Sequence, residues 1–362
     1  MPISRRTLMQ SSAALAATGA VAACKPGDAV KSAPDLADYT TDLLNDAVDL
    51  ILNSYPESAS SAGLDTGDRK HLKSKLTDRS QAGQDKIAGD VRALVKRLQK
   101  VDTSGLDADA ALNVDVVKTI FETTAYGFDF PYGDIAQVNY NWSYRNSPYA
   151  VAQNTGAFTE IPSFLDSSHK IETAEDADAY LMRMNAYADQ LDGETERTKD
   201  FGGQGVILPD FLLTKTLGQL KGALAKDPTT WGIVTGLAGK TENMAMDYGA
   251  DAAVLAREKL VPAMQRQVAV LEDQAARATS DAGVWAKPRG DEYYDWNIRA
   301  STTTKMSADE IHQMGLDELA ELQGRMEPIL QSIGYTKGSV GARMTALAED
   351  PRYHFADGDA GR

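Results

Sequence analysis

Apolar residues recur along most of this chain at spacings of three and four, the period of an amphipathic helix. One apolar stripe covers 36–52 and stops at Tyr55-Pro56, and further stripes cover 87–101 and 112–121. A proline cannot donate its backbone N–H to a helix and disfavours a helical residue before it. The first third of the chain is therefore predicted to form three helices.

The middle of the chain continues this pattern with recognisable helix ends. The Thr173 hydroxyl can cap a helix whose apolar face extends to Leu191, and Gly193 is expected to follow its end. Pro209 suits the first turn of the next helix. A long helical region is then expected over 241–278, with a break or kink at Pro262.

The clearest helix signal comes last. Ser307 and Glu310 have the spacing of a capping box, and an apolar stripe follows with a kink expected at Pro328. Gly334 is placed as the left-handed residue that ends this helix. Because the alternation typical of strands is nearly absent, the pattern predicts an all-α fold. The exception is a strand or small hairpin that is possible within 283–303.

The N-terminus has the features of an export signal. Arg5 and Arg6 precede a short apolar run that ends at Cys24, an order typical of a twin-arginine signal peptide with a lipobox. Residues 1–23 would be removed, the Cys24 thiol would carry the lipid, and 24–34 would form a polar tether. Ordinary cleavage after an Ala-x-Ala, leaving a free thiol, is the alternative. The lipid reading places the protein on the periplasmic side of the cell envelope, anchored to a membrane.

Composition and charge narrow the picture further. The chain is 43% apolar and 25% charged, which is typical of a globular protein, and 35–362 is predicted to be one helical domain. Cys24 is the only cysteine, so a packed core and not a disulfide framework must hold the mature chain together. The net charge of −15 disfavours nucleic acid as a partner, since its phosphates would repel the protein.

One stretch, 126–164, departs from the helical pattern and holds ten of the 26 aromatic residues. Rings beside amide side chains suit a surface that contacts peptide or sugar, because rings offer area and amides offer directed hydrogen bonds. The candidate cleft residues in this stretch are Tyr140, Trp142, Tyr144 and Tyr149. The alternative is a long loop whose rings pack on the helices as satellite core.

Motifs for catalysis are incomplete in this sequence. Its four histidines are far apart, and the zinc-binding pattern His-Glu-x-x-His is absent; His312 has Leu316 where a second ligand would stand. There is no Gly-x-Ser-x-Gly nucleophile motif, and the one Ser-x-x-Lys, from Ser167 to Lys170, is expected by chance in a chain of this length. The residues therefore supply neither a catalytic set nor a metal site.

Short blocks along the chain resemble, in the same order, the N-terminal part of the bacterial domain of unknown function 885 family. The blocks are Ser147-Pro148-Tyr149, Gly156-Ala157-Phe158, Ile161 to Leu165, Asp176 to Met184, Val206 to Leu213, Val261-Pro262-Ala263, Gly290 to Tyr294, Thr302-Thr303-Thr304, Ser307 to Gly315, Gly334 to Gly341 and Leu347 to Arg352. No single block is diagnostic, but their order and coverage from about 35 to 362 are specific.

The resemblance implies a helical fold of the zinc-metallopeptidase type and peptide as substrate. The family's His-Glu-x-x-Pro-Gly-His segment lies in a C-terminal half that has no counterpart here, so zinc is implied only for a complete family member. We expect this chain to be truncated or fragmentary at Arg362. Tyr293, Tyr294, Thr303 and His312 join the candidate cleft residues because the most specific blocks contain them. For Tyr293 and Tyr294, the sequence leaves open whether they face a cleft or the core.

Two hypotheses of different classes follow. In the first, the chain is the substrate-side, non-catalytic part of an exported lipoprotein that resembles zinc peptidases, and it lacks its C-terminal half as a partner. In the second, it is a complete helical envelope lipoprotein that binds peptide or a protein partner without chemistry. A half-protein should expose a large apolar patch where its other half is missing, whereas a self-sufficient binding protein should not.

Overall fold

The structure is a computed structural model that describes residues 33–136, 138–139 and 146–361. Within these ranges it contains α-helices and short helical turns, and two isolated β-bridges in place of any strand. The all-α prediction is confirmed. The described residues include no helix that is long and apolar enough to cross a membrane.

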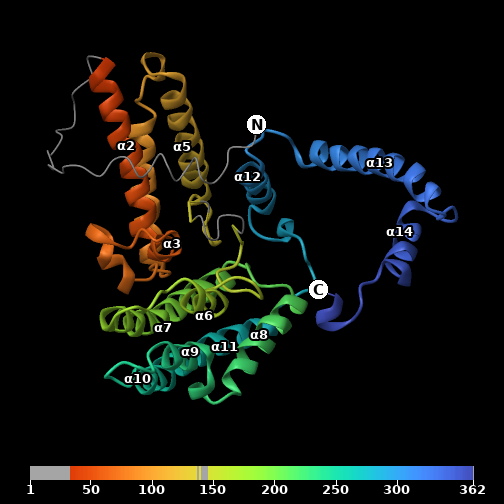
Figure 1. The fold of residues 1–362 in the computed structure, drawn as a ribbon. Helices are drawn as coiled ribbons and strands as arrows, with labels where there is room; N and C mark the ends of the chain where they lie inside the picture. Colours follow the sequence, from red (N-terminus) through yellow and green to blue (C-terminus); the bar gives the residue numbers. More distant parts are fainter. Residues whose placement is uncertain (1–32, 137, 140–145, 362) are drawn as a thin grey trace.

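The first helices form a layer with its own apolar core (Figure 1). They are α2 (Ala33–Ser54), α3 (Pro56–Ala62), α4 (Gln81–Leu98) and α5 (Ala108–Gly127), with the 3₁₀ segments η1 (Gly67–Ser74) and η2 (Thr103–Gly105) between them. α2, α4 and α5 correspond to the three predicted stripes. Leu43, Val91 and Phe121, one from each helix, are buried together in this core. Since α2 begins at Ala33, the last two residues assigned to the tether belong to a helix.

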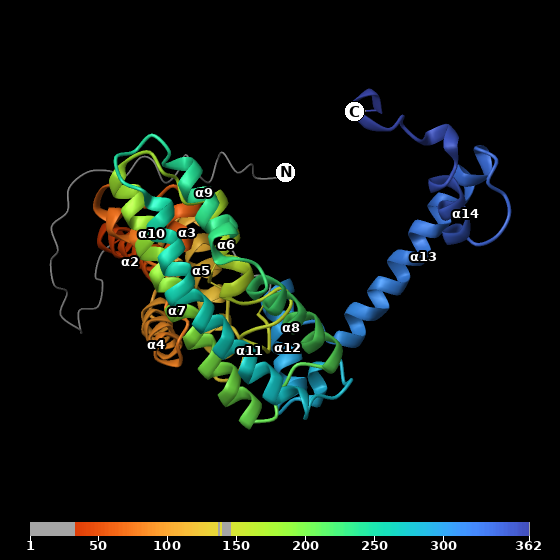
Figure 2. The ribbon, with the colours of Figure 1, turned by 90° about the horizontal axis from the view of Figure 1, so that it is seen from below.

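A second and larger core lies among the later helices. These are α6 (Ala157–Ser167), α7 (Ala174–Gly203), α8 (Asp210–Leu224), α9 (Gly232–Lys240), α10 (Tyr248–Leu255), α11 (Val261–Ala275) and α12 (Gly290–Thr302), with the short turns η3 (Pro228–Thr230) and η5 (Val284–Ala286). α7 packs against α6, α10 and α11 and lies at the centre of this group (Figures 1 and 2). It begins with the capping predicted at Thr173, extended to a full capping box by Asp176.

Two expected helix ends are corrected by the structure. α7 does not stop near Gly193 but continues to Gly203. Gly193 lies where the backbone of Ser80 approaches α7, and a Cβ added there would stand 2.8 Å from the Ser80 backbone nitrogen. The glycine is thus required by a close approach and not by a helix end. The expected break at Pro262 is a π-helical turn, η4 (Ala256–Leu260), directly before α11.

The possible hairpin within 283–303 is wrong. This stretch contains η5 and the helix α12, which buries Tyr293, Trp296 and Ala300. Those residues are three and four apart, so the stretch has helical periodicity that its rings and threonines obscured. Trp296 packs against Gly127 of α5, where an added Cβ would come within 2.3 Å of the indole ring.

The last helices, α13 (Ala308–Ser332) and α14 (Val340–Ala348), project from the rest of the molecule (Figure 2). Two short turns, η6 (Pro351–Tyr353) and η7 (Gly358–Gly361), follow them. The capping box of Ser307 and Glu310 is present, α13 continues through Pro328, and Gly334 has the predicted left-handed conformation with φ of 92°. We call α13 and α14 together the arm and the preceding helices the body.

Candidate functional site

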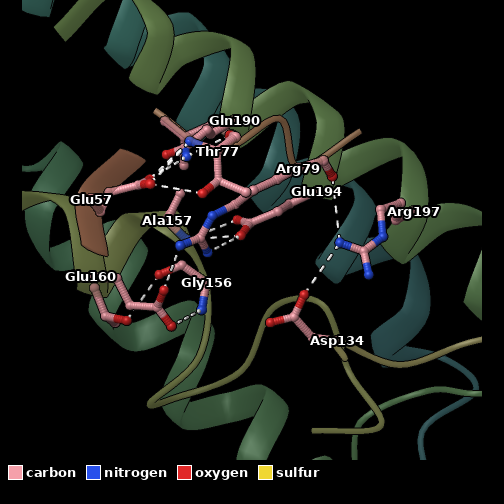
Figure 3. Close-up of polar contacts among 12 residues, drawn as sticks. Glu57, Thr77, Arg79, Asp134, Gly156, Ala157, Glu160, Gln190, Glu194 and Arg197 are labelled. Carbon is pink, nitrogen blue, oxygen red and sulfur yellow. Dashed lines mark hydrogen bonds and ion pairs between the residues drawn. The ribbon is translucent and has the colours of Figure 1, made fainter. Parts of the chain in front are cut away.

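The most concentrated buried charge in the described residues surrounds Arg79, which lies directly before α4. Its guanidinium reaches between α6 and α7 and forms ion pairs with Glu160 (Nη2 to Oε2, 2.5 Å) and Glu194 (Nη1 to Oε1, 2.7 Å) (Figure 3). All three side chains are at least 93% buried. Because isolated charges are costly to bury, this pairing is what permits them inside the fold.

The N-terminus of α6 supplies further donors to the same carboxylates. The backbone N–H of Ala157 donates to both oxygens of Glu194, at 3.0 and 2.9 Å, and the N–H of Gly156 donates to Glu160 at 3.3 Å. These N–H groups have no partner within the helix, and the helix dipole favours negative charge at this end. Gly156 has φ of 116°, a backbone conformation that glycine adopts readily and that residues with a Cβ rarely adopt.

A further part of the network joins α3 to α7. The Glu57 carboxylate accepts hydrogen bonds from the backbone N–H and hydroxyl of Thr77 and from the amide of Gln190 (Figure 3). The Gln190 amide also donates to the Thr77 carbonyl at 2.8 Å. Glu57 is therefore held by three donor groups from outside α3.

Arg197, one turn beyond Glu194 on α7, extends the network to Gly133 and Asp134, in the segment between α5 and α6. It donates to the carbonyl of Gly133 at 2.7 Å and lies 3.4 Å from the Asp134 carboxylate. The same guanidinium approaches the Arg79 carbonyl at 3.4 Å. Charged residues of α7 thus contact the segments on both sides of it.

The charge balance around Arg79 gives Glu194 an unusual pKa. Burial raises the pKa of Glu194 to about 7, although Arg79 and the Ala157 N–H oppose that shift. Burial alone would lower the pKa of Arg79, but Glu160 and Glu194 raise it well above its usual value. For Glu194, the cost of burial thus outweighs the support that Arg79 and the Ala157 N–H give to the charged form.

A second buried cluster fixes the state of His169. Arg183 of α7 donates to His169 Nδ1 at 2.8 Å, and His169 Nε2 lies 2.9 Å from the Asp176 carbonyl. A guanidinium cannot accept and a carbonyl cannot donate, so the ring is neutral with its proton on Nε2. Burial and the neighbouring Arg183 lower the pKa of His169 to about 4. With both nitrogens engaged, His169 is not available to bind a metal.

A cavity of about 160 Å³ lies beside this network. It is lined by Glu57, Ser61, Glu160, Ile161, Ser163, Phe164, Ser167 and Ser168. Ser167, from the Ser-x-x-Lys match, donates its hydroxyl to the Ser163 carbonyl at 2.8 Å within α6. This bond is an ordinary helical contact and does not make the serine a nucleophile.

The candidate cleft residues do not converge on this network. Tyr293 is 1% exposed and stacks on Tyr132 in the larger core, and its hydroxyl donates to the Asn146 carbonyl at 2.9 Å. Its assignment to an open cleft is therefore corrected to the core. Tyr149 is half-buried against the same core. Burial in the core is the alternative considered for the aromatic stretch.

The other candidates lie elsewhere. Tyr294 and Thr303 are exposed on α12 and at its end, and His312 is exposed near the start of α13. Tyr140, Trp142 and Tyr144 lie outside the described residues, as do Arg5, Arg6 and Cys24. A cleft role stays a prediction for the exposed residues.

The charged residues around Arg79 were missed from the sequence, although a signal was present. Glu194 falls three residues after Leu191 and seven after Tyr187, so it occupies the apolar face of α7. A carboxylate at a core position needs a buried partner, and Arg79 is that partner. Nothing in the sequence indicates which arginine it would be.

The residues present do not fit the zinc that the family resemblance implies. Across the described ranges, no three His, Cys, Asp or Glu side chains are grouped so that they could hold a metal ion. The carboxylates around Arg79 are paired with arginine and helix N–H groups. No catalytic step through zinc can be derived from this part of the chain.

Comparison with known proteins places the chain in a family. None of the curated proteins matches it. Among solved structures, the chain is similar to one named "the putative lipoprotein from Colwellia psychrerythraea", with a TM-score of 0.83 and 25% sequence identity over 92% of this chain. The chain spans 57% of the length of that Colwellia protein.

The family model described as bacterial protein of unknown function (DUF885) matches residues 56–362. This range contains both buried charge networks and the arm, and it covers most of the chain. The family predicted from the ordered sequence blocks is confirmed, and the chain belongs to the DUF885 family.

Proposed function

We propose that this chain is the substrate-side, non-catalytic portion of an exported envelope lipoprotein whose complete form hydrolyses peptides with zinc. The observation that carries the proposal is the similarity to the Colwellia protein. It covers 92% of this chain but 57% of the Colwellia protein, so 43% (100% − 57%) of the Colwellia protein lies outside the matched region. The peptidase activity rests on the family resemblance, and the zinc ligands would come from that additional region.

The ion network supports a scaffolding role for this portion. Arg79, Glu160 and Glu194 join the N-terminal layer to α6 and α7, so the two layers are held as one unit. A rigid unit of this kind suits a wall against which a substrate is positioned. Tyr294 and Thr303 are exposed at the end of the body nearest the arm, and His312 is exposed near the start of the arm. These three residues are the candidate substrate contacts.

Peptide hydrolysis is tested on two proteins side by side. The Colwellia protein and the mature form of this chain, from Cys24, are each given an internally quenched peptide library with zinc, and then with a metal chelator. We expect zinc-dependent cleavage by the Colwellia protein and none by this chain alone. Failure of the Colwellia protein to cleave, or cleavage that survives the chelator, would contradict the proposal.

The envelope location has a separate test. Cells that express the full chain are labelled with a radioactive fatty acid, and the label should appear on the protein and be lost in Cys24→Ser. Replacing Arg5 and Arg6 with lysine should leave the precursor in the cytoplasm, because the export machinery reads the arginine pair. A labelled Cys24→Ser variant would refute lipidation at this cysteine.

A further inference from the structure

We propose that one face of α13 is an interior surface of the longer protein, covered there by polypeptide equivalent to the unmatched 43% of the Colwellia protein. This α13 face consists of Leu319, Leu322, Met326 and Ile329, together with Ile333 at the C-cap of the helix. The inference rests on the proposed function, since it assigns the surface by which the non-catalytic portion meets the rest. It concerns assembly, and its test does not measure hydrolysis.

The α13 face is apolar and mostly open to solvent: Met326 is half-buried and its other four side chains are exposed. Leu319 is 51% exposed, Leu322 47% and Ile329 61%, and Leu330 is the one residue of α13 that is buried. The members of the face follow one another at spacings of three, four, three and four, which places them in a single line along the helix. Side chains of this size and spacing match a helix that packs against another element.

The rest of the arm does not cover this face. α14 packs on the neighbouring side of α13, where Leu330 is buried and Arg343 forms an ion pair with Glu327. Arg343 also donates to the carbonyl of Tyr335 at 3.3 Å, which ties the α13–α14 turn together. The arm is therefore internally folded, while four of the five side chains of the α13 face stay exposed.

The junction between body and arm sets the direction of α13 (Figure 2). Thr303 ends α12 with φ of 56°, a left-handed conformation that is strained for a β-branched residue. The Thr302 and Thr304 hydroxyls are 3.0 Å apart, and Thr304 accepts the N–H of Met306 at 3.4 Å. These contacts stabilise a turn that carries α13 away from the body.

The charge of α13 selects the kind of partner. Its acidic residues are Asp309, Glu310, Asp317, Glu318, Glu321 and Glu327, and its one arginine is Arg325, so its net charge is −5 (1 − 6) with His312 neutral. Acidic side chains also line a shallow hollow along the helix, between Glu310 and Glu321. A second copy of α13 would be repelled, whereas an apolar segment flanked by lysine or arginine would be attracted.

The test compares one substitution in two contexts. Leu322→Asp in the mature form of this chain should change the melting temperature by less than about 2 °C, because the side chain is already exposed. Aspartate at the structurally equivalent position of the full-length Colwellia protein should lower its melting temperature by at least about 5 °C, because the charge would be buried. Gln323→Asp, on the solvated side, is the matched control and should change neither protein.

Two outcomes would overturn the inference. Equally small effects of the aspartate in both proteins would mean that the face stays open in the longer one. If light scattering instead shows this chain to be a dimer that Leu322→Asp dissociates, the occupant is a second copy. Neither outcome depends on peptide cleavage, so the assembly and the activity can fail independently.

Discussion

α7 and α13 are the two longest helices described. Their sequences share the same local pattern, but one helix is buried and the other is exposed. Both begin with a capping box and both carry a line of large apolar residues. α7 encloses charged side chains such as Arg183, Glu194 and Arg197, whereas in α13 three of the four leucines, Leu316, Leu319 and Leu322, are about half exposed. Local sequence thus determines that a segment is helical, but not whether its apolar face is covered.

The difference comes from what surrounds each helix. α7 has neighbours on several sides, from α6, α10, α11 and the segment before α4, so even its polar positions need internal partners. α13 has α14 on one side. Charge burial in α7 and apolar exposure in α13 therefore both result from unequal packing. We expect substitutions that disturb α7 to lower stability more than substitutions on α13.

The largest effect is expected from removing the arginine that supports α7. Arg79→Met leaves Glu160 and Glu194 buried without their cation, and should lower the free energy of unfolding by about 3–5 kcal/mol. The matched control is Arg266→Ala, which breaks an exposed pair with Asp192 of α7 and should cost less than about 1 kcal/mol. Urea denaturation measures both, and equal losses would show that burial of the Arg79 pairs contributes nothing.

The next effect is a pH dependence from the His169 cluster beside α7. Burial and Arg183 lower the pKa of His169 from 6.5 to about 4, so between these values the unfolded chain binds a proton that the folded chain does not. The contribution is fully present above pH 6.5 and is lost as the pH falls toward 4, with a size of about 3 kcal/mol.

Denaturation midpoints at several pH values test this assignment. His169→Gln should reduce the acid-induced loss of stability between pH 6.5 and 4, and His312→Gln on α13 should leave it in place. Over part of this range Glu194 acts in the opposite direction, because its raised pKa makes the folded chain bind the proton more tightly. The comparison is therefore made in the Glu194→Gln background.

The smallest effects should have opposite signs in the two helices. Gly193→Ala on α7 would place a methyl group 2.8 Å from the Ser80 backbone nitrogen, and should cost about 1–3 kcal/mol. Gly324→Ala on α13 meets no atom within 4 Å and should stabilise by up to about 1 kcal/mol, since alanine favours helix. Thermal unfolding of the two variants provides the comparison, and a shift of the same sign in both would break it.

Much of the fold could be predicted from local signals. The stripes of α2, α4 and α5, the caps at Thr173 and Ser307, and the left-handed Gly334 all depend on residues within a few positions of one another. The predictions were wrong where contacts between segments far apart in the sequence determine the local structure. Gly193 was assigned to a helix end because the approach of Ser80, more than 100 residues away, cannot be detected locally. The hairpin expected within 283–303 was wrong because α12 has its periodicity hidden by rings that pack on α5 and the 130s.

The candidate site likewise has features that local sequence indicates and features that only long-range packing determines. Glu194 at an apolar position of α7 indicates a buried partner, but its pairing with Arg79 joins residues 115 apart. Tyr293 has the ring and hydroxyl of a ligand-contacting residue, and packing against Tyr132 places it in the core instead.

The sequence by itself determined the helical class, several helix ends, the family resemblance and the expectation of export, because each rests on spacing or on contiguous residues. Only the tertiary structure decided that Arg79 is enclosed by two carboxylates, that His169 is neutral, and that α13 is open to solvent. Burial depends on which distant surfaces meet, and no local pattern records it. For that reason α7 and α13, two helices with a similar pattern, differ in burial: α7 encloses charged side chains in the core, and α13 exposes apolar side chains in the arm.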